Sequence, residues 1–346
     1  MTTRMHAEIL EQPAAVAATL DDLLPLAGEI ERLGDGLRQV LFIARGSSDN
    51  AAVYGQYLCS VRAGRLGVLA SPSVATAYRA PVDLSGVLAV AVSQSGRTEE
   101  IVATQEWARA CGARTVAVTN DGGSPLAGEA DLALVTRAGE ELAVPATKTF
   151  TTQLAALAVL GLALGGDRAG LEGLRSVPDA LSRALSVASA AEALADRLTY
   201  VQTLVVSARG YAYAVARELA LKLQEACYVT TLGLSYADLE HGPIAVVDAD
   251  TPALLIAAEH DDAMLAAMTA LARRCAEDGG HVYGIGGDSE FAAACLAALP
   301  EVALPAWLSP LTLVVPGQLL VEALARAKGI DPDVPRGLRK VTQTSA

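Results

Sequence analysis

The chain repeats its own pattern of apolar runs and helical segments, and this repeat limits the fold more than any other feature. Leu41–Gly46 and Val205–Gly210 both end in Ala-Arg-Gly, and they lie 164 residues apart (205 − 41 = 164). Cys111 and Cys275 each precede a further apolar run, and they have the same offset (275 − 111 = 164). Because two separate landmarks share one offset, the sequence indicates two copies of one structural unit.

Each copy alternates short apolar runs with segments of helical periodicity. Strands that are apolar throughout are typical of a parallel sheet whose two faces are covered by helices. The runs predicted as strands are Val40–Ala44, Val87–Val92, Thr115–Thr119 and Leu132–Val135 in the first copy, and Leu204–Ala208, Ala253–Ala257, Val282–Ile285 and Val302–Leu304 in the second. We therefore expect an α/β fold with two tandem, doubly wound parallel-sheet subdomains and flanking helices.

The predicted organisation has five parts. They are an N-terminal helical segment (1–30), a first subdomain (31–165), connecting helices (166–198), a second subdomain (199–330) and a tail (331–346). The uncharged stretch Thr149–Gly166 begins with threonine and glutamine, which favours a buried helix over a membrane span.

Composition limits the classes of molecule that the protein can bind and the compartment in which we expect it. The formal net charge of −13 argues against nucleic acid or an anionic membrane surface. The five cysteines are far apart and lack metal-ligand spacing, as expected of reduced thiols. The first thirty residues lack the basic-then-apolar pattern of a signal peptide. We expect a cytoplasmic protein.

Ser93–Thr98 (Ser-Gln-Ser-Gly-Arg-Thr) follows a predicted strand and precedes a predicted helix over Glu99–Ala110. Short hydroxyl side chains and free backbone N–H groups at a helix N-terminus can bind a phosphate without a lysine. Ser93, Gln94, Ser95 and Thr98 are the candidate ligands, although an ordinary serine-rich helix cap has the same local pattern. The second copy has Glu259, Asp261 and Asp262 at the corresponding place, so we expect one phosphate site per chain.

Weaker signals lie at neighbouring strand ends. Ser48 follows the turn at Gly46, and it could either complete the phosphate shell or cap a helix. Thr147 follows the fourth predicted strand and could make a phosphate or backbone contact. Glu141 could reach a sugar hydroxyl.

Lys222 and Glu225 share one helix face, three residues apart. A surface ion pair is the ordinary explanation of this spacing. His241 stands before Gly-Pro, in a turn that cannot continue as a helix. It follows the Lys222 and Glu225 helix closely in sequence, which favours a role as a general acid or base. Lys340, in the C-terminal tail, is either part of a frayed basic end or an amine nucleophile that closes over the ligand.

Together these motifs resemble the sugar isomerase (SIS) family, in particular the isomerase half of the glutamine–fructose-6-phosphate amidotransferases. The resemblance is nearly full length. It is carried by Glu8–Pro13, Arg45–Ser48, Ser93–Thr98, Thr147–Gln153, Leu219–Glu225, Glu240–Pro243, Val315–Pro316 with Gln318–Leu320, and Pro335–Arg336.

The resemblance implies a role for each matching residue. Ser48, Ser93, Gln94, Ser95 and Thr98 match phosphate contacts, and Val144 matches a backbone contact to the sugar. The implied catalytic side chains have distinct roles. Glu225 moves a proton between C1 and C2, and Lys222 stabilises the enolate oxygen. His241 opens the sugar ring from the partner subunit of a homodimer, and Lys340 engages the ketose carbonyl as an imine.

Two departures from the amidotransferases shape the expected function. The chain enters the isomerase region almost at Met1, without a glutaminase segment before it, and Ala146 replaces a serine that touches the sugar. We therefore expect a deaminase that converts glucosamine 6-phosphate and water to fructose 6-phosphate and ammonia, without a metal or organic cofactor. The alternatives are a fructosamine-6-phosphate deglycase, a galactosamine-6-phosphate deaminase and a sugar-phosphate sensor without turnover.

Overall fold

The computed structural model describes residues 2–340, and the chain divides into two compact units. Of the described residues, the N-terminal unit comprises 12–141, 148–178 and 339–340, and the C-terminal unit comprises 2–11, 142–147 and 179–338. Residues 341–346 of the predicted tail lie outside the described residues. In this division the first helix and the segment 142–147 belong with the C-terminal half of the chain.

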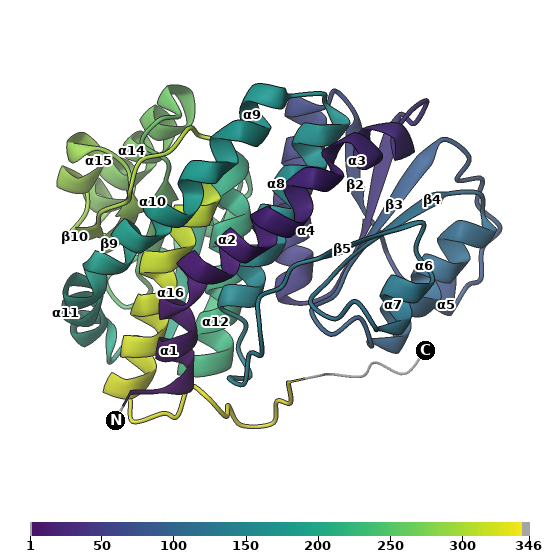
Figure 1. Cartoon of the computed structure of the whole chain (residues 1–346). Helices are drawn as coiled ribbons and strands as arrows, with labels where there is room; N and C mark the ends of the chain where they lie inside the picture. Colours follow the sequence, from purple (N-terminus) through teal and green to yellow (C-terminus); the bar gives the residue numbers. More distant parts are fainter. Residues whose placement is uncertain (1, 341–346) are drawn as a thin grey trace. The chain divides into compact units, whose positions relative to one another are not determined.

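The N-terminal unit is built on a parallel five-stranded sheet of order β2-β1-β3-β4-β5. Its strands are β1 (Gln39–Ile43), β2 (Leu66–Leu69), β3 (Val87–Val92), β4 (Arg114–Thr119) and β5 (Leu132–Val135). Its helices are α2 (Gln12–Leu23), η1 (Leu24–Leu26), α3 (Ala27–Leu33), α4 (Ser47–Arg62), α5 (Ser73–Thr76), α6 (Glu99–Ala110), α7 (Pro125–Gly128), α8 (Lys148–Leu164), α9 (Arg168–Gly173) and η2 (Leu174–Ser176) (Figure 1).

The C-terminal unit has a second parallel five-stranded sheet of order β10-β9-β8-β6-β7. Its strands are β6 (Thr203–Ala208), β7 (Thr230–Ser235), β8 (Ala253–Ala257), β9 (Val282–Gly286) and β10 (Ala297–Leu299). Its helices are α1 (Arg4–Leu10), η3 (Leu185–Val187), α11 (Ala188–Leu198), η4 (Gly210–Ala212), α12 (Tyr213–Cys227), α13 (Tyr236–Glu240), η5 (Pro243–Val246), α14 (Asp262–Glu277), α15 (Ser289–Ala293) and α16 (Ser309–Ala327), and α10 (Val177–Ala184) crosses the boundary of the two units.

The two sheets have the same topology when the second is read from its other edge, which confirms the predicted tandem α/β fold. β1 and β6 begin 164 residues apart (203 − 39), and so do β2 and β7 (230 − 66). The offset found in the sequence is therefore the offset between the first two pairs of equivalent strands.

One predicted strand is wrong. Val302–Leu304 is irregular, and the edge strand β10 is formed instead by Ala297–Leu299, which pairs with β9. Pro300 and Pro305 flank the stretch 301–304, whose first residue is Glu301, and proline cannot donate to a strand ladder. The edge strands β2 and β7 were not predicted because both are partly exposed and carry a glycine.

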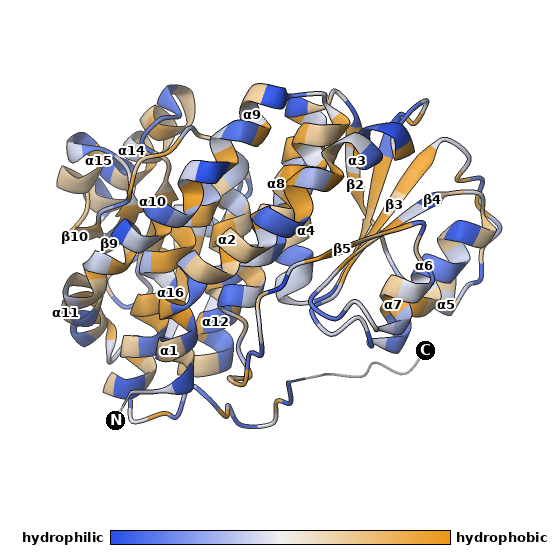
Figure 2. Cartoon of the chain, in the orientation of Figure 1, coloured by the Kyte–Doolittle hydropathy of each residue, from blue (hydrophilic) through white to orange (hydrophobic). Residues whose placement is uncertain are grey.

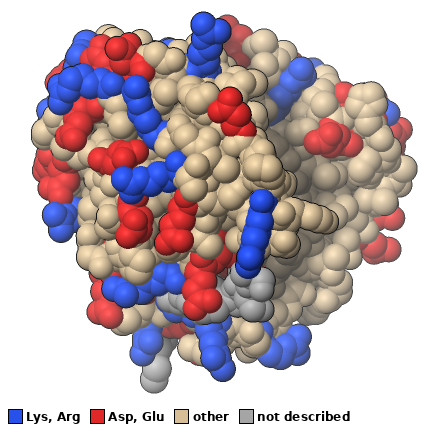
Figure 3. Space-filling model, turned by 90° about the vertical axis from the view of Figure 1, so that its right-hand side faces the viewer, with Lys and Arg blue, Asp and Glu red and all other residues tan. Residues whose placement is uncertain are grey.

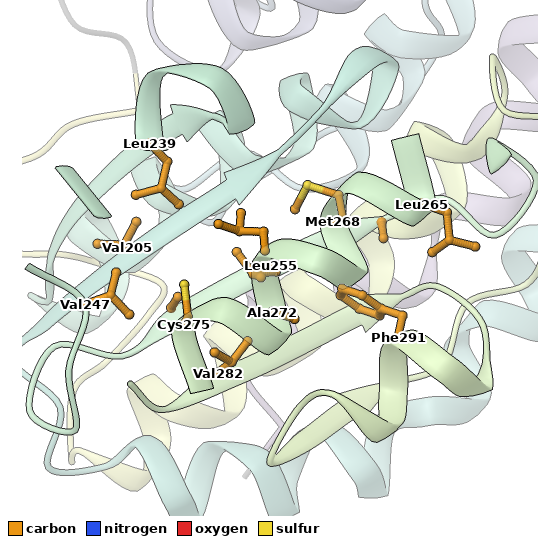
Figure 4. Close-up of a cluster of buried hydrophobic side chains, with 13 residues drawn as sticks. Val205, Leu239, Val247, Leu255, Leu265, Met268, Ala272, Cys275, Val282 and Phe291 are labelled. Carbon is orange, nitrogen blue, oxygen red and sulfur yellow. The ribbon is translucent and has the colours of Figure 1, made fainter. Parts of the chain in front are cut away.

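Each unit has its own aliphatic core. In the N-terminal unit, apolar side chains of β3, which is strongly hydrophobic in Figure 2, and Ala117 of β4 pack against α6 and α7. In the C-terminal unit, Leu255 and Val282 of the sheet pack against Met268 and Cys275 of α14, with Phe291 at one end of the cluster (Figure 4). The predicted buried helix is α8, in which every residue is buried. Among the described residues, no helix is long and apolar enough to cross a membrane.

Candidate active site

The predicted phosphate loop lies at the switch point of the first sheet. β1 and β3 are parallel neighbours, so the turn before α4 and the loop before α6 both start at the C-terminal ends of the strands, on the same side of the sheet. Ligands of open α/β sheets bind at this kind of strand end, where the strand order reverses. The first N–H groups of α4 and α6 have no acceptor within their own helices, and an anion can accept from them.

The loop Ser93–Thr98 is held in shape by backbone hydrogen bonds from the next strand. The N–H of Ser93 donates to Val118 (3.0 Å), and the N–H of Asn120 donates to the carbonyl of Gln94 (3.0 Å). The hydroxyl of Ser95 accepts from the N–H of Arg97 (3.2 Å). The loop is therefore preorganised rather than assembled around a ligand.

Gly96 is required by this shape. Its φ of +60° is a conformation that residues with a side chain seldom adopt. A Cβ atom at this position would lie 2.1 Å from the Ser124 hydroxyl oxygen and 2.9 Å from that of Thr119. The glycine lets the loop lie directly against the turn that follows β4.

Ser48 has a buried partner from a distant part of the chain. Gln153 of α8 donates from Nε2 to the Ser48 hydroxyl oxygen at 3.0 Å. That bond uses Ser48 as an acceptor, so the Ser48 O–H is left to donate to another group. Gln153 is itself 2 % exposed, and it therefore fixes the position of the serine.

Both arginines beside the loop are bound to carboxylates. Arg97 donates to Asp121 at 2.8 Å, and this bond lowers the pKa of Asp121. Arg45 makes a two-pronged contact with Glu100 at 2.9 and 3.1 Å. An anion in this loop would therefore be held mainly by hydroxyls and backbone N–H groups.

The predicted acid–base pair lies on α12 of the C-terminal unit. Lys222 is 1 % exposed and its Nζ contacts Oε2 of Glu225, whose side chain is 21 % exposed. Nζ also lies 3.6 Å from Oε1 of Glu218, one turn earlier and fully buried. The lysine is thus placed between two carboxylates, of which only Glu225 reaches solvent.

The position of α12 depends on a close approach to α16. A Cβ atom on Gly317 of α16 would lie 2.2 Å from Leu219, so only glycine fits beneath this part of α12. Leu219 follows Glu218 directly and precedes Lys222 by three residues. The packing that fixes Leu219 therefore also fixes the charged side chains on the same helix.

His241 lies outside that cluster, at the exposed end of the short helix α13. Its N–H donates to Ala237 at 3.1 Å, and Gly242 follows with a φ of +133°. The preceding Glu240 accepts from Arg274 at 3.1 Å and from the Tyr236 hydroxyl, which raises the pKa of Tyr236. These bonds fix the backbone before His241 while its imidazole stays accessible.

The remaining predicted contacts lie on or next to the segment 142–147. The N–H of Val144 donates to the carbonyl of Asp333 at 3.0 Å. Thr147 is fully buried, and its carbonyl accepts from Gln318 at 3.2 Å. Glu141 belongs to the N-terminal unit, where it accepts from Thr149 and from Lys340.

At the corresponding strand ends of the second sheet the groups are acidic. The N–H of Glu259, after β8, donates to Glu301 at 2.5 Å, and burial raises the pKa of Glu301 to about 7. Carboxylates at this edge would repel a phosphate.

Sequence reasoning missed two residues that support the site. Glu218 lies four residues before Lys222, a helical spacing that could have indicated it. Gln153 lies 105 residues from Ser48, and no local pattern in the chain could have paired them.

The surface view shows no concentration of one charge. On the face in Figure 3, Lys and Arg side chains alternate with Asp and Glu side chains.

Comparison with known proteins identifies the family in which these motifs occur together. A model of the SIS domain matches residues 37–163 and 198–321, which are the two copies seen in the fold. The glutamine–fructose-6-phosphate aminotransferase (isomerizing) of Symbiobacterium thermophilum is 34% identical over 97% of this chain, and that of Bordetella parapertussis is also 34% identical over 97%. The chain spans 58% and 57% of the length of these two relatives.

Solved structures give the same result. A Silicibacter pomeroyi DSS-3 protein, provisionally assigned as a phosphosugar isomerase, is 34% identical with a TM-score of 0.85, and the match covers 96% of this chain and all of that one. The C-terminal domain of the Francisella tularensis glucosamine-fructose-6-phosphate aminotransferase is 26% identical with a TM-score of 0.86, over 97% and 99% of the two chains. Glucosamine-6-phosphate deaminase of Thermotoga maritima shares the fold, with 23% identity and a TM-score of 0.79 over 99% and 100% of the chains.

The family model covers both sheets, and the Silicibacter protein matches over its whole length. The chain belongs to the SIS domain family.

Proposed function

We propose that this protein is an aminosugar-phosphate isomerase that works as a deaminase, converting glucosamine 6-phosphate and water to fructose 6-phosphate and ammonia. The names of the aminotransferase relatives indicate a hexose 6-phosphate and an amino group. The observation that carries the proposal is the buried Lys222 held against Glu225 on α12, because isomerisation needs a carboxylate base beside a fixed cation.

Phosphate binding is assigned to the N-terminal unit. The hydroxyls of Ser48, Ser93, Ser95 and Thr98, the Gln94 amide and the first N–H groups of α6 would donate to the phosphate oxygens. Thr98 precedes α6 without using its side chain as a cap, so its hydroxyl is available to a ligand. Sugar hydroxyls would contact the segment 142–147, including the Val144 backbone and Thr147.

The reaction begins with ring opening. His241 would carry the proton between the ring oxygen and the C1 hydroxyl, which gives the open-chain aldehyde. Its exposed position suits a histidine that serves a second copy of the chain. The proposal therefore includes a homodimer with His241 acting across subunits, which measurement of the mass in solution would test.

Proton transfer follows at C1 and C2. The Glu225 carboxylate removes the proton from C2, the electrons move to the carbonyl oxygen at C1, and the Lys222 ammonium stabilises the resulting negative charge. Glu225 then returns the proton to C1, and a proton moves from nitrogen to the C1 oxygen, so that a ketose imine with a double bond between C2 and nitrogen remains. The partial exposure of Glu225 lets it reach a substrate, whereas the buried Lys222 is fixed.

Hydrolysis completes the sequence. Water adds to C2 of the imine, the nitrogen takes a proton, and the carbon–nitrogen bond breaks to give ammonia and the C2 carbonyl. Lys340 would act as a relay by forming its own imine at C2 as ammonia leaves, which water then cleaves.

The test is an assay of ammonia release from a panel of amino-hexose 6-phosphates, with glucosamine 6-phosphate expected to be turned over fastest. Glu225→Gln should bind the substrate but lose turnover by at least about 100-fold. Wild-type rates in that variant would refute the assignment of the base. Release of free amino acid from a fructosamine 6-phosphate adduct, without ammonia release from glucosamine 6-phosphate, would replace the deaminase with a deglycase. Faster turnover of galactosamine 6-phosphate would change the stereochemical assignment at C4.

A further inference from the structure

Tyr228 has a backbone conformation that aromatic residues seldom adopt. It follows α12 directly with φ +53° and ψ 32°, in the left-handed region, and its N–H donates to Leu223. Glycine or asparagine is usual at such a helix end. A strained residue next to a functional helix indicates that its side chain serves a purpose there.

The side chain of Tyr228 holds the C-terminal tail. Its hydroxyl oxygen accepts the backbone N–H of Arg336 at 2.7 Å, and the Arg336 guanidinium lies 4.9 Å from the centre of the tyrosine ring. One residue thus binds both the backbone and the cation of Arg336. We call this pair of contacts the Tyr228–Arg336 clamp.

The clamp acts on a closed turn. The N–H of Leu338 donates to Pro335 at 3.3 Å, and Gly337 has the positive φ (+78°) that this turn needs. Upstream, the Asp333 carboxylate accepts the N–H groups of Arg4 and Met5, both at 2.8 Å. The tail is therefore fixed at two points within the C-terminal unit before it reaches Lys340.

Lys340 is only two residues beyond Leu338. Two residues of extended chain span about 7 Å, so the turn limits where the lysine backbone can lie. We propose that Tyr228 is a positioning residue for the Lys340 amine, and that the clamp keeps this amine within reach of the substrate carbonyl. This inference rests on the proposed role of Lys340 at C2 of the sugar.

The chemistry gives a direct readout. The unprotonated Lys340 amine adds to the C2 carbonyl of fructose 6-phosphate and loses water, which gives an imine. Borohydride then delivers hydride to the carbon and water supplies the proton to nitrogen, so that a stable secondary amine remains. Mass spectrometry of the tail peptide measures the rate of this labelling at Lys340, independently of ammonia release.

The test compares Tyr228 variants at saturating fructose 6-phosphate. Tyr228→Phe keeps the ring and should slow the labelling about threefold, because it loses one hydrogen bond. Tyr228→Asn suits the left-handed backbone and should keep or raise the melting temperature, yet slow the labelling about tenfold or more. Arg336→Gln removes the cation at an exposed position and should also slow the labelling.

Tyr200→Phe is the matched control, because Tyr200 is 90 % exposed in the same unit. Wild-type labelling rates in both Tyr228→Asn and Arg336→Gln would overturn the clamp, as would a wild type that is never labelled at Lys340. If the wild type is labelled but releases no ammonia from glucosamine 6-phosphate, the proposed deaminase activity fails while the clamp is still tested. The clamp is supported only if labelling falls in these variants while their folding is preserved.

Discussion

Lys340 and Glu141 form an ion pair in which the carboxylate is fully buried. The lysine Nζ lies 2.6 Å from Oε2 of Glu141, and the exposed fractions of the two side chains are 25 % and 0 %. Glu141 also accepts from Thr149, at 2.6 Å from the hydroxyl and 3.1 Å from the N–H. These contacts place the tail lysine against Glu141, and the sugar contact expected of Glu141 from the sequence stays a prediction.

Glu141→Gln should separate these two roles. An amide keeps the shape but loses the charge that attracts Lys340, so we expect kcat to fall about tenfold with KM nearly unchanged. If Glu141 instead binds the sugar, KM should rise while kcat changes less. Steady-state kinetics decide between the two, and Glu140→Gln at the exposed neighbouring position should behave as wild type.

Gly96→Ala should damage the phosphate loop. The added methyl group would meet the Ser124 and Thr119 hydroxyls, and alanine also disfavours the positive φ. We expect affinity for the sugar phosphate to fall about tenfold or more, which is about 1.4 kcal/mol of binding free energy. Titration calorimetry with fructose 6-phosphate measures this. Gly128→Ala in α7, where a methyl group meets nothing within 4 Å, is the control, and equal affinities in the two variants would contradict the prediction.

Glu218→Gln tests the support of Lys222. Breaking a buried ion pair on one side costs about 3–5 kcal/mol of folding free energy, because a charge is left uncompensated. Glu225 remains as a partner here, so we expect a loss at the lower end of that range, measured by chemical denaturation. The kcat should fall at least about tenfold, because Lys222 loses one of the two carboxylates that position it.

A double variant controls for instability. Glu218→Leu with Lys222→Met replaces the buried pair by apolar groups and should recover much of the lost stability. It should not recover turnover, because no cation is left at the reacting oxygen. Activity in this double variant would show that Lys222 has no chemical role.

Much of the fold could be predicted because it depends on local patterns. The apolar runs of β1, β3, β4, β6, β8 and β9 are long and buried, and the shared offset of 164 residues gave the tandem repeat. Ala297–Leu299 could not be recognised as a strand because alanine has little preference for strands. Its position is set by pairing with β9, which is a tertiary interaction.

The candidate site was predictable only where its residues are close in sequence. Lys222 and Glu225 share a helix face, so their spacing indicated the pair. The contacts of Gln153 with Ser48, Lys340 with Glu141, and Arg336 with Tyr228 join residues 105, 199 and 108 positions apart. Such pairs depend on the path of the chain through the fold, and the periodicity of apolar residues in the sequence does not reveal that path.

Glu301 should make folding stability depend on pH. Burial raises its pKa from 4.5 to about 7, so the folded state binds more protons than the unfolded state between these values. Stability therefore falls as the pH rises from about 4.5 to about 7, and the loss is complete above that range. Glu301→Gln removes the titration, so the variant should be more stable than wild type at pH 8, by about 3 kcal/mol, and similar to it at pH 4. Denaturant unfolding at both pH values measures the difference, with the exposed Glu277→Gln as the control. A Glu301→Gln variant whose advantage is the same at both pH values would show that this carboxyl is not the titrating group.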